Sequence, residues 1–458
     1  MAKTRNRDFL GTDDMKVLLV KLSLPALIAM LSNALYNVID TIFVGHGVGT
    51  LAISALSIAF PLQMIIGAFA LMFGVGAASI TSIEIGKKNM SEAANSSAGG
   101  ITIAMIVAFI IMITCEIFLE PILRAFGASD TILPMAIEYS RIMLFGLPFL
   151  TFSMVSNNLV RSTGDAKTAM KSMLIGTVSN TILDPIFIFG FHMGIKGAAV
   201  ATLIGQILGS LYMLHYFLKG RYAVPLKKEN FKLKPKLVVR TIVLGTATLV
   251  RQLGTSAIAL VANNLLGSLS GDVAIAAFGV INRIGTVFLL PIYGLNQGVQ
   301  PIVGYNFGAG KTKRIKECLR ISIKWALALG LLGELVMILL PVPLISMFGN
   351  DPQLIKVAAP ALRIYSTALI FVGIQALGAT FYQAIGRGVP SIILGLLRQF
   401  ILLLPLMLLL SSTLGLFGIW LAFPISDTVS AIITAIFLII GVKKLPKDIS
   451  ELDIADVD

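Results

Sequence analysis

Cysteine, histidine and charged residues are scarce in this sequence, and each shortage excludes a class of protein. The two cysteines, Cys115 and Cys318, lie in or beside apolar runs and provide neither a disulfide framework nor metal-ligand spacing. The three histidines lie near the ends of apolar runs, again without the spacing of a metal site. The sequence also lacks a glycine-rich Lys-Ser/Thr run for ATP, a Ser-His-Asp arrangement and a zinc signature. We therefore expect neither an enzyme nor a bound cofactor.

Apolar residues take the place of the missing charge. The chain is 56% hydrophobic and 13% charged, with a mean hydropathy of +0.90, and a soluble protein of 458 residues could not bury that much apolar surface. Its apolar runs are about 20 residues long, the length at which a helix crosses a bilayer. Because only helices and closed barrels satisfy every backbone group in lipid, we expect an all-α membrane protein. The net charge of +13 lies in short loops, which argues against nucleic-acid binding.

Twelve apolar runs divide the chain into two halves of six. We expect an N-terminal lobe at 17–218 and a C-terminal lobe at 241–441, joined by a basic connector at 219–240. Short segments at 1–16 and 442–458 flank the lobes. The expected membrane spans are 17–43, 52–80, 94–118, 132–159, 169–191, 194–218, 241–265, 273–303, 318–341, 354–383, 390–411 and 414–441.

The basic residues predict the orientation of these spans. Of the 36 Lys and Arg residues, we place 28 in the two tails and the even-numbered loops. The odd-numbered loops hold only Arg124, Lys196 and Lys356. Because cytoplasmic loops carry the excess of Lys and Arg, we expect both termini in the cytoplasm of a multi-pass protein of the cell membrane.

The two halves repeat each other at one constant spacing, which we call the repeat offset. At this offset the following pairs coincide: Gly45 with Gly267, Gly76 with Gly298, Phe126 with Phe348, Gly164 with Gly386, and Arg141 with Arg363. Shared apolar composition alone would not align two charged residues. Six spans per half is an even number, so both halves lie the same way up, as in the parallel repeats of secondary transporters.

Polar residues of the spans are distributed unequally between the halves. At the repeat offset Asp40, Asn180 and Asp184 fall on Ala262, Leu402 and Leu406. The second half instead carries Arg251, Arg283 and Arg398 opposite Ala29, Pro61 and Gly176. The halves therefore share an architecture and differ in chemistry.

Asp184 lies in an apolar run, where a carboxylate costs roughly 3 kcal/mol on insertion scales. Asn180 precedes it by four residues, so on a helix the two share a face. Pro185 follows and should bend the helix, freeing the carbonyl of Thr181. One carboxylate, one amide and one carbonyl on the same side predict a site for a proton or a small cation.

Two further spans present polar faces that could line the same cavity. In the first span Asn33, Asn37 and Asp40 share one helical face. In the sixth span Thr202 and Gln206 lie four residues apart. Two neighbouring carboxylates repel each other unless a cation or a proton lies between them, so we expect Asp40 and Asp184 to share a coupling ion. In the alternative interpretation these side chains only hold helices together by hydrogen bonds.

Five arginines lie within spans: Arg141, Arg251, Arg283, Arg363 and Arg398. Their simplest role is structural pairing inside each lobe, with Glu138, Glu334 and Asp427 as candidate partners. If they lined the transport pathway instead, an anionic substrate would be more plausible. Several of the 18 methionines, Met64 and Met173 among them, lie in spans near the expected cavity, where flexible thioethers suit varied apolar ligands.

Three motifs resemble the multidrug and toxic compound extrusion (MATE) family, in particular its prokaryotic MepA- and DinF-like branch. They are Leu35-Tyr-Asn-Val-Ile-Asp-Thr-Ile-Phe-Val-Gly45, Arg161-Ser-Thr-Gly-Asp165, and Gly294-Leu-Asn-Gln-Gly-Val-Gln-Pro-Ile-Val-Gly-Tyr-Asn306. The resemblance implies twelve helices in two six-helix bundles that form a V. It also implies export of bulky, often cationic, apolar compounds against a proton or Na⁺ gradient.

Family site residues carry over to specific positions of this sequence. The resemblance implies a coupling-cation site, with H⁺ or Na⁺ as the ion, at Asp40, Asn180, Asp184 and Thr202. It implies substrate contacts at Tyr36, Asn37, Met64, Asn157, Met173 and Gln206. Another branch binds Na⁺ through acidic residues of spans 7 and 10, but those spans offer Arg251 and Arg363 here, so we expect no cation site in the C-terminal lobe.

We therefore predict a monomeric cation/drug antiporter that works by alternating access. Uptake of the ion by Asp40 and Asp184 would let span 1 bend near Pro25 and shrink the substrate cavity. The sequence leaves H⁺ and Na⁺ open, because the carboxylates suffice for a proton while Asn180 and Thr202 offer neutral oxygens to Na⁺. A flippase of lipid-linked sugars is the nearest alternative, and a membrane-embedded enzyme or receptor is a more distant one.

Overall fold

Every regular element in the described part of the chain is helical, as the apolar runs predict. The structure is a computed structural model that describes residues 8–349 and 351–446. The predicted tails 1–16 and 442–458 fall partly outside these residues. The helices of the first half are α1 (Met15–Gly47), α2 (Thr50–Gly86), α3 (Met90–Ile117), α4 (Leu119–Ala125), α5 (Leu133–Ser162), α6 (Ala166–Pro185) and α7 (Ile195–Leu218), and short turns occur at Phe9–Gly11 and Lys228–Phe231.

The second half continues with α8 (Pro235–Gly308) and ends with α14 (Leu404–Lys443). Between them lie α9 (Thr312–Leu339), α10 (Pro341–Ser346), α11 (Pro352–Ser366), α12 (Leu369–Ala384) and α13 (Gly388–Leu396). Two segments are π-helical, Ile186–Gly190 after α6 and Leu397–Leu403 between α13 and α14. Such widened turns insert one extra residue into a helix and are frequent at functional sites.

The described residues contain the twelve expected spans. Nine helices are long and apolar enough to cross a membrane, and α11 with α12 forms a tenth span that bends by 50°. Two of these nine helical segments each contain two spans. Gly271 inside α8 and Gly415 inside α14 have a non-helical backbone, and at each of them one apolar helix ends and the next begins. Glycine suits these corners because its φ is positive at both.

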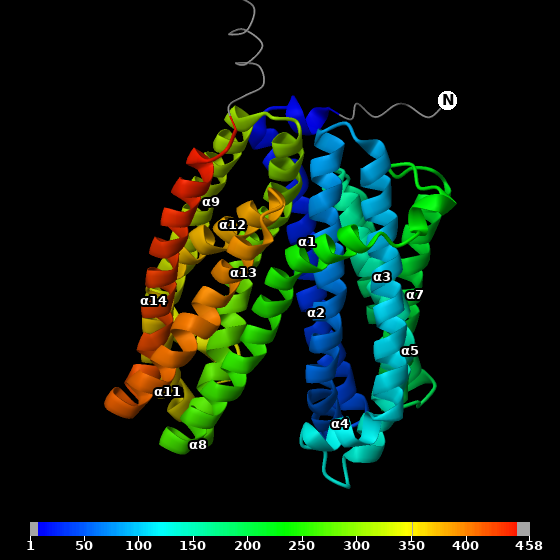
Figure 1. The fold of residues 1–458 in the computed structure, drawn as a ribbon. Helices are drawn as coiled ribbons and strands as arrows, with labels where there is room; N and C mark the ends of the chain where they lie inside the picture. The colour runs from blue at the N-terminus through cyan, green and yellow to red at the C-terminus, as the bar shows by residue number, and fades with distance from the viewer. Residues whose placement is uncertain (1–7, 350, 447–458) are drawn as a thin grey trace, which may run out of the picture. The chain divides into compact units, whose positions relative to one another are not determined.

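The chain forms two compact units, which we call unit 1 and unit 2. Unit 1 contains residues 24–245 and unit 2 contains 8–23 together with the described residues from 246 onward. Within unit 1, α2 lies beside α3 and α5, and α7 lies beside α5 and α6 (Figure 1). Apolar clusters fill both interiors, around Ala136 and Ala198 in unit 1 and around Phe278 and Trp420 in unit 2.

The units exchange the first parts of two helices. The start of α1, up to Ser23, belongs to unit 2, and the start of α8, up to Gly245, belongs to unit 1. The boundaries fall at Ser23/Leu24 and at Gly245/Thr246, two places that the repeat offset relates to each other. In unit 2 a Cβ atom on Gly298 would meet the backbone nitrogen of Ser23 at 3.1 Å. In unit 1 a Cβ atom on Gly76, the repeat equivalent of Gly298, would meet the backbone nitrogen of Gly245 at 3.2 Å. The exchange therefore follows the internal repeat, and it shifts the unit boundaries from the lobes expected at 17–218 and 241–441.

The repeat also changes register once. Gly164 and Gly386 both have positive φ and are separated by the repeat offset. Gly194 and Gly415 both have φ 59°, with ψ −137° and −136°, but they lie one position closer together than the repeat offset requires. One residue is thus missing from the second half between these pairs. Beyond this point the equivalent of Gln206 is Asp427.

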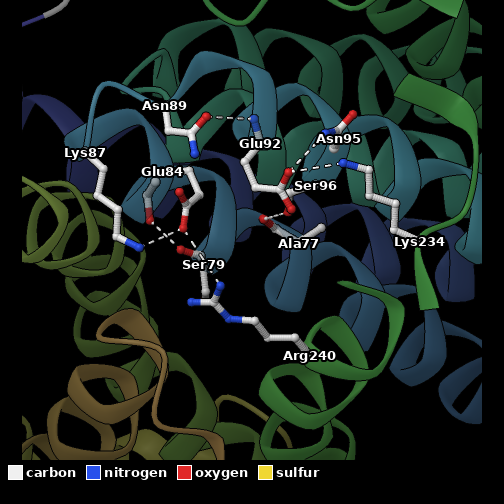
Figure 2. Close-up of polar contacts among 11 residues, drawn as sticks. Ala77, Ser79, Glu84, Lys87, Asn89, Glu92, Asn95, Ser96, Lys234 and Arg240 are labelled. Carbon is white, nitrogen blue, oxygen red and sulfur yellow. Dashed lines mark hydrogen bonds and ion pairs between the residues drawn. The ribbon is translucent and has the colours of Figure 1, made fainter. Parts of the chain in front are cut away.

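Polar contacts hold the basic connector to the ends of α2 and α3 (Figure 2). The buried carboxylate of Glu84 pairs with Lys87 at 3.0 Å and with Arg240 at 3.8 Å. Glu92 on α3 pairs with Lys234 at 3.3 Å. The connector is therefore part of unit 1 and folds back on it as α8 begins.

The arginine of span 4 does not pair as predicted. Arg141 donates to Glu116 on α3 at 2.6 Å, and Glu138 instead accepts Lys196 at 3.0 Å. The prediction was wrong because Glu138 lies one turn before Arg141 on the same helix, whereas a neighbouring helix offers each side chain a better partner.

The arginines of unit 2 divide into paired and unpaired ones. Arg398 makes two hydrogen bonds to Asp427, which confirms that predicted pairing. Arg363 instead donates to the carbonyl of Ile338 at 3.2 Å, while Glu334 accepts the backbone N–H of Ile370 at 3.2 Å. Glu334 is therefore not the partner of Arg363.

Candidate functional site

The candidate site begins on α6, where Asn180 and Asp184 are both buried. The Nδ2 atom of Asn180 donates to Oδ1 of Asp184 at 3.4 Å, as their four-residue spacing predicts. Pro185 ends α6, and the helix then widens into the π-helical segment Ile186–Gly190. A proline removes one backbone hydrogen bond, and the wider turn accommodates that loss directly beside Asp184.

Helix α7 brings a hydroxyl to the same place. Asn180 also donates through Nδ2 to Oγ1 of Thr202 at 3.0 Å. The two helices approach closely because Gly176 faces Gly205, and a Cβ atom added to Gly205 would lie 2.6 Å from the Gly176 carbonyl oxygen. Two glycines thus allow the side chains of Asn180 and Thr202 to meet.

Helix α1 contributes the second carboxylate. Asp40 is 9% exposed, and its side chain lies beside that of Asp184. One turn earlier on α1, the side chain of Tyr36 lies close to Thr202. The four residues predicted for the coupling cation, from three helices, therefore lie together, and Tyr36 joins them.

Several oxygen atoms in this cluster lack a donor. Oδ1 of Asp40, Oδ2 of Asp184 and Oδ1 of Asn180 are buried, and no hydrogen-bond partner exists for them in the described residues. Nor does any basic side chain of the described chain form an ion pair with either carboxylate. Two carboxylates in contact repel each other, and buried acceptors are costly without donors. A proton or a small cation between the carboxylates would satisfy both requirements.

The donor set suits H⁺ or Na⁺ better than a transition metal. Across the described residues no group of three or more His, Cys, Asp and Glu side chains could hold a metal ion. Two carboxylates, one amide and one hydroxyl are hard oxygen ligands, which favour alkali and alkaline-earth cations over thiolate- or imidazole-binding metals.

The residues predicted to contact substrate are distributed around this cluster. Gln206 lies one turn after Thr202 on α7, and its buried Oε1 atom has no hydrogen-bond partner among the residues that the structure describes. Asn157 on α5 is buried and donates to Oγ of Ser153 at 3.3 Å. Met64 on α2 and Met173 on α6 are half-buried. These side chains come from α2, α5, α6 and α7, all within unit 1.

Asn37 lies apart from the buried cluster. Its side chain is exposed and donates to the Asn33 carbonyl at 2.7 Å and to Oδ1 of Asn33 at 3.3 Å. Asn33, Asn37 and Asp40 share a face of α1 as predicted, but only Asp40 is buried.

Tyr139 is a member of the site that sequence reasoning missed. It is buried on α5, and its hydroxyl accepts a hydrogen bond from Nε2 of Gln63 at 3.3 Å. It also interacts electrostatically with both Asp40 and Asp184. No spacing in the sequence marks this tyrosine, because its neighbours come from three other helices.

Unit 2 has no counterpart of the cluster among its described residues. The equivalents of Asp40 and Asn180 are Ala262 and Leu402, and after the change of register that of Thr202 is Phe423. Ala262 and Phe423 belong to the apolar core of unit 2. The cation chemistry is thus an addition to one copy of a duplicated scaffold.

Comparisons with known proteins agree with the duplicated architecture. The family model described as MatE matches residues 25–186 and again residues 247–409, and the starts of the two matches are related by the repeat offset. A protein of Shewanella oneidensis named FAD transporter is 29% identical over 423 residues, which cover 90% of this chain and 92% of that protein. A protein of Staphylococcus haemolyticus named Multidrug export protein MepA is 28% identical over 421 residues, which cover 92% of each chain.

Solved structures resemble the chain over nearly its whole length. One of them is described as the outward-facing conformation of a multidrug resistance MATE family transporter of the MOP superfamily. It matches with a TM-score of 0.91 at 27% identity and covers 97% of this chain and 99% of that one.

Proposed function

Because the chain belongs to the MatE family and is a transporter of its MepA-like branch, we propose that it exchanges H⁺ or Na⁺ for bulky, apolar, often cationic compounds and so exports them. The observation that carries this proposal is the contact of Asp40 with Asp184 in a buried cluster without a basic partner among the described residues. Relatives named Multidrug export protein MepA support drugs as the substrates.

The mechanism follows from the repulsion between the two carboxylates. Binding of one cation brings Asp40 on α1 and Asp184 on α6 together and draws the two helices toward each other. Release of the ion restores the repulsion and loosens α1. Helix α1 contains Pro25, which lacks a backbone N–H and so weakens the helix near the unit boundary at Leu24. A cationic compound competes for the same negative charge, which couples its release to ion uptake.

Orientation and assembly are parts of the same proposal. Both termini lie in the cytoplasm, supported by the concentration of Lys and Arg in the even-numbered loops and the connector. The protein works as a monomer in the cell membrane, because one chain supplies both carboxylates, the amide and the hydroxyl of the cation site.

Asp184→Asn tests the mechanism, because it removes the charge and keeps the shape of the side chain. In cells that make the variant, we expect ethidium efflux to fall at least about tenfold, the factor that corresponds to about 1.4 kcal/mol. The matched control is Asp272→Asn, because Asp272 is an exposed aspartate outside the cluster. It should export ethidium like the wild type.

Purified protein in liposomes identifies the ion. A pH gradient and a Na⁺ gradient are imposed separately, and we expect one of them to drive substrate counterflow in the wild type but not in Asp184→Asn. Wild-type ethidium efflux by a well-expressed Asp184→Asn protein would refute the proposed coupling.

A further inference from the structure

Unit 2 contains a cavity whose polar lining is basic. The cavity has a volume of about 30 Å³ and lies between α8, α12, α13 and the π-helical segment Leu397–Leu403. Its polar side chains are Arg251, Tyr293, Gln375, Arg398 and Gln399, and the remaining lining is apolar. No carboxylate of the described chain lines it.

The two arginines of this cavity differ in whether an acidic side chain balances their positive charge. Arg398 is neutralised by two hydrogen bonds to Asp427, whose side chain is buried. Arg251 has no acidic partner among the described residues, and its side chain is accessible. A guanidinium in an apolar helix is costly unless an anion or water satisfies it. The cavity therefore carries one uncompensated positive charge.

A second polar group of the cavity also lacks a partner. Gln399 donates through Nε2 to Oγ1 of Thr255 at 2.9 Å. Its Oε1 atom is buried and has no hydrogen-bond partner in the described part of the chain. This atom lies against Gly254, where an added Cβ atom would meet it, and so it is covered by α8. The charged group that the cavity offers to a ligand is therefore the guanidinium of Arg251.

The internal repeat relates this cavity to the region of unit 1 predicted to contact substrate. Ala379 and Gly395, which line the cavity, are the equivalents of Asn157 and Met173. Asp427, the partner of Arg398, takes the place of Gln206. The same part of the scaffold is therefore lined by uncharged residues in one unit and by arginines in the other.

We propose that the cavity of unit 2 binds a phosphate or carboxylate group, with Arg251 as its principal charged ligand. The planar guanidinium of Arg251 can take such a group with two parallel hydrogen bonds. The group belongs either to a carried solute or to a lipid head group. This inference does not depend on the cation site of unit 1, because none of its residues belongs to that cluster.

The first experiment compares two fluorescent probes that differ only in a phosphate. Full-length protein in phosphatidylcholine nanodiscs is titrated with riboflavin 5′-phosphate and with riboflavin, and binding is followed by fluorescence polarisation. For a solute site, the wild type binds the phosphate ester more tightly than riboflavin. Arg251→Gln then weakens the phosphate ester at least about tenfold and leaves riboflavin unchanged, while Arg251→Lys retains part of the difference.

The matched control is Arg283→Gln. Arg283 is an exposed arginine of the same helix, α8, that does not line the cavity, and its removal should not change binding of either probe. Thermal unfolding of each variant identifies a protein that has failed to fold, and Arg251→Lys keeps the test valid if the glutamine variant does not fold.

The second experiment tests a lipid as the source of the anion. Native mass spectrometry counts the phosphatidylglycerol molecules retained by the wild type, by Arg251→Gln and by Arg283→Gln. Loss of one retained lipid only in Arg251→Gln assigns the cavity to a head group. Loss only of the phosphate preference for the flavin assigns it to a solute. If removal of Arg251 changes neither, the proposal is wrong.

Discussion

Gly205→Ala should disturb the cation site without touching any of its polar residues. A Cβ atom at Gly205 would lie 2.6 Å from the carbonyl oxygen of Gly176 and 3.3 Å from Cβ of Asn180. Real Cβ atoms essentially never approach another heavy atom within 3.0 Å, so α6 and α7 must move apart to admit the methyl group. The obstacle is backbone, which cannot turn away as a flexible side chain would.

This separation acts directly on the hydrogen bond between Asn180 and Thr202. That bond is 3.0 Å long, and Thr202 lies on α7 one turn before Gly205. Overpacking of this kind costs about 1–3 kcal/mol. In unit 2 the equivalent of Gly205 is Ser426, whose hydroxyl donates to the Arg398 carbonyl at 2.8 Å, so the helices there are spaced to hold a side chain.

The assay combines thermal unfolding of purified protein with ion-driven counterflow in liposomes. We expect Gly205→Ala to lower the unfolding temperature and to raise the ion concentration needed for half-maximal counterflow. Gly99→Ala is the matched control, because a Cβ atom at Gly99 on α3 would meet no described atom within 4 Å. Wild-type stability and ion dependence in Gly205→Ala would refute the argument that glycine contact positions the site.

Two further substitutions test ion pairs within each unit. Glu84→Gln should lower the free energy of unfolding by only about 1 kcal/mol, because Lys87 and Arg240 are half-exposed and solvent screens both ion pairs. A calorimetric scan would measure this loss, and an unchanged unfolding temperature would contradict the prediction. Arg398→Met should lower the free energy of unfolding by about 3–5 kcal/mol, because it leaves Asp427 buried without its partner. The double variant that also carries Asp427→Leu should recover most of this loss, as measured by denaturant unfolding. Equal stability of the single and double variants would contradict this account.

Patterns within one helix could be predicted from the sequence. The spacing of Asn180 and Asp184 predicted a shared face, and the structure shows the hydrogen bond between them. The twelve spans followed from the length of the apolar runs, and the internal repeat followed from aligned glycines and the aligned Arg141 and Arg363; the MatE family match agrees with the repeat. These features are local or repeated, so the order of residues predicts them directly.

Contacts between helices could be predicted less well from the sequence. The pairing of Arg141 with Glu116 depends on which helix lies beside α5, and spacing within α5 pointed to Glu138 instead. Tyr139 joins the cluster of Asp40 and Asp184 through contacts that only the packing of α1, α5 and α6 creates. Sequence alone could not identify these partners, because each apolar helix has several faces that could pack against a neighbour and the sequence does not specify which face does.

The backbone geometry was predicted least well. Pro185 indicated a bend, but the structure accommodates it by the π-helical segment Ile186–Gly190 rather than by a simple kink. The missing residue between Gly386 and Gly415 shifted the equivalent of Gln206 to Asp427, which a constant offset could not reveal. Small insertions change which side chains face each other without changing the apolar pattern.

The exchange of helix ends between the units makes the order of synthesis matter. Residues 8–23 are made before the rest of the described chain, yet their hydrogen-bond partners in unit 2 are made much later: Tyr305 binds Asp8, Asn306 binds the Leu10 carbonyl, and Arg314 binds the Asp13 carbonyl. The entropic cost of closing such a long loop rises only slowly with its length, so the delay is a matter of time rather than of stability. Unit 2 therefore cannot be completed until most of the chain has been made. Residues 8–23 are thus among the last of the described residues to find their place, and a chain that ends before Tyr305 leaves them without these partners.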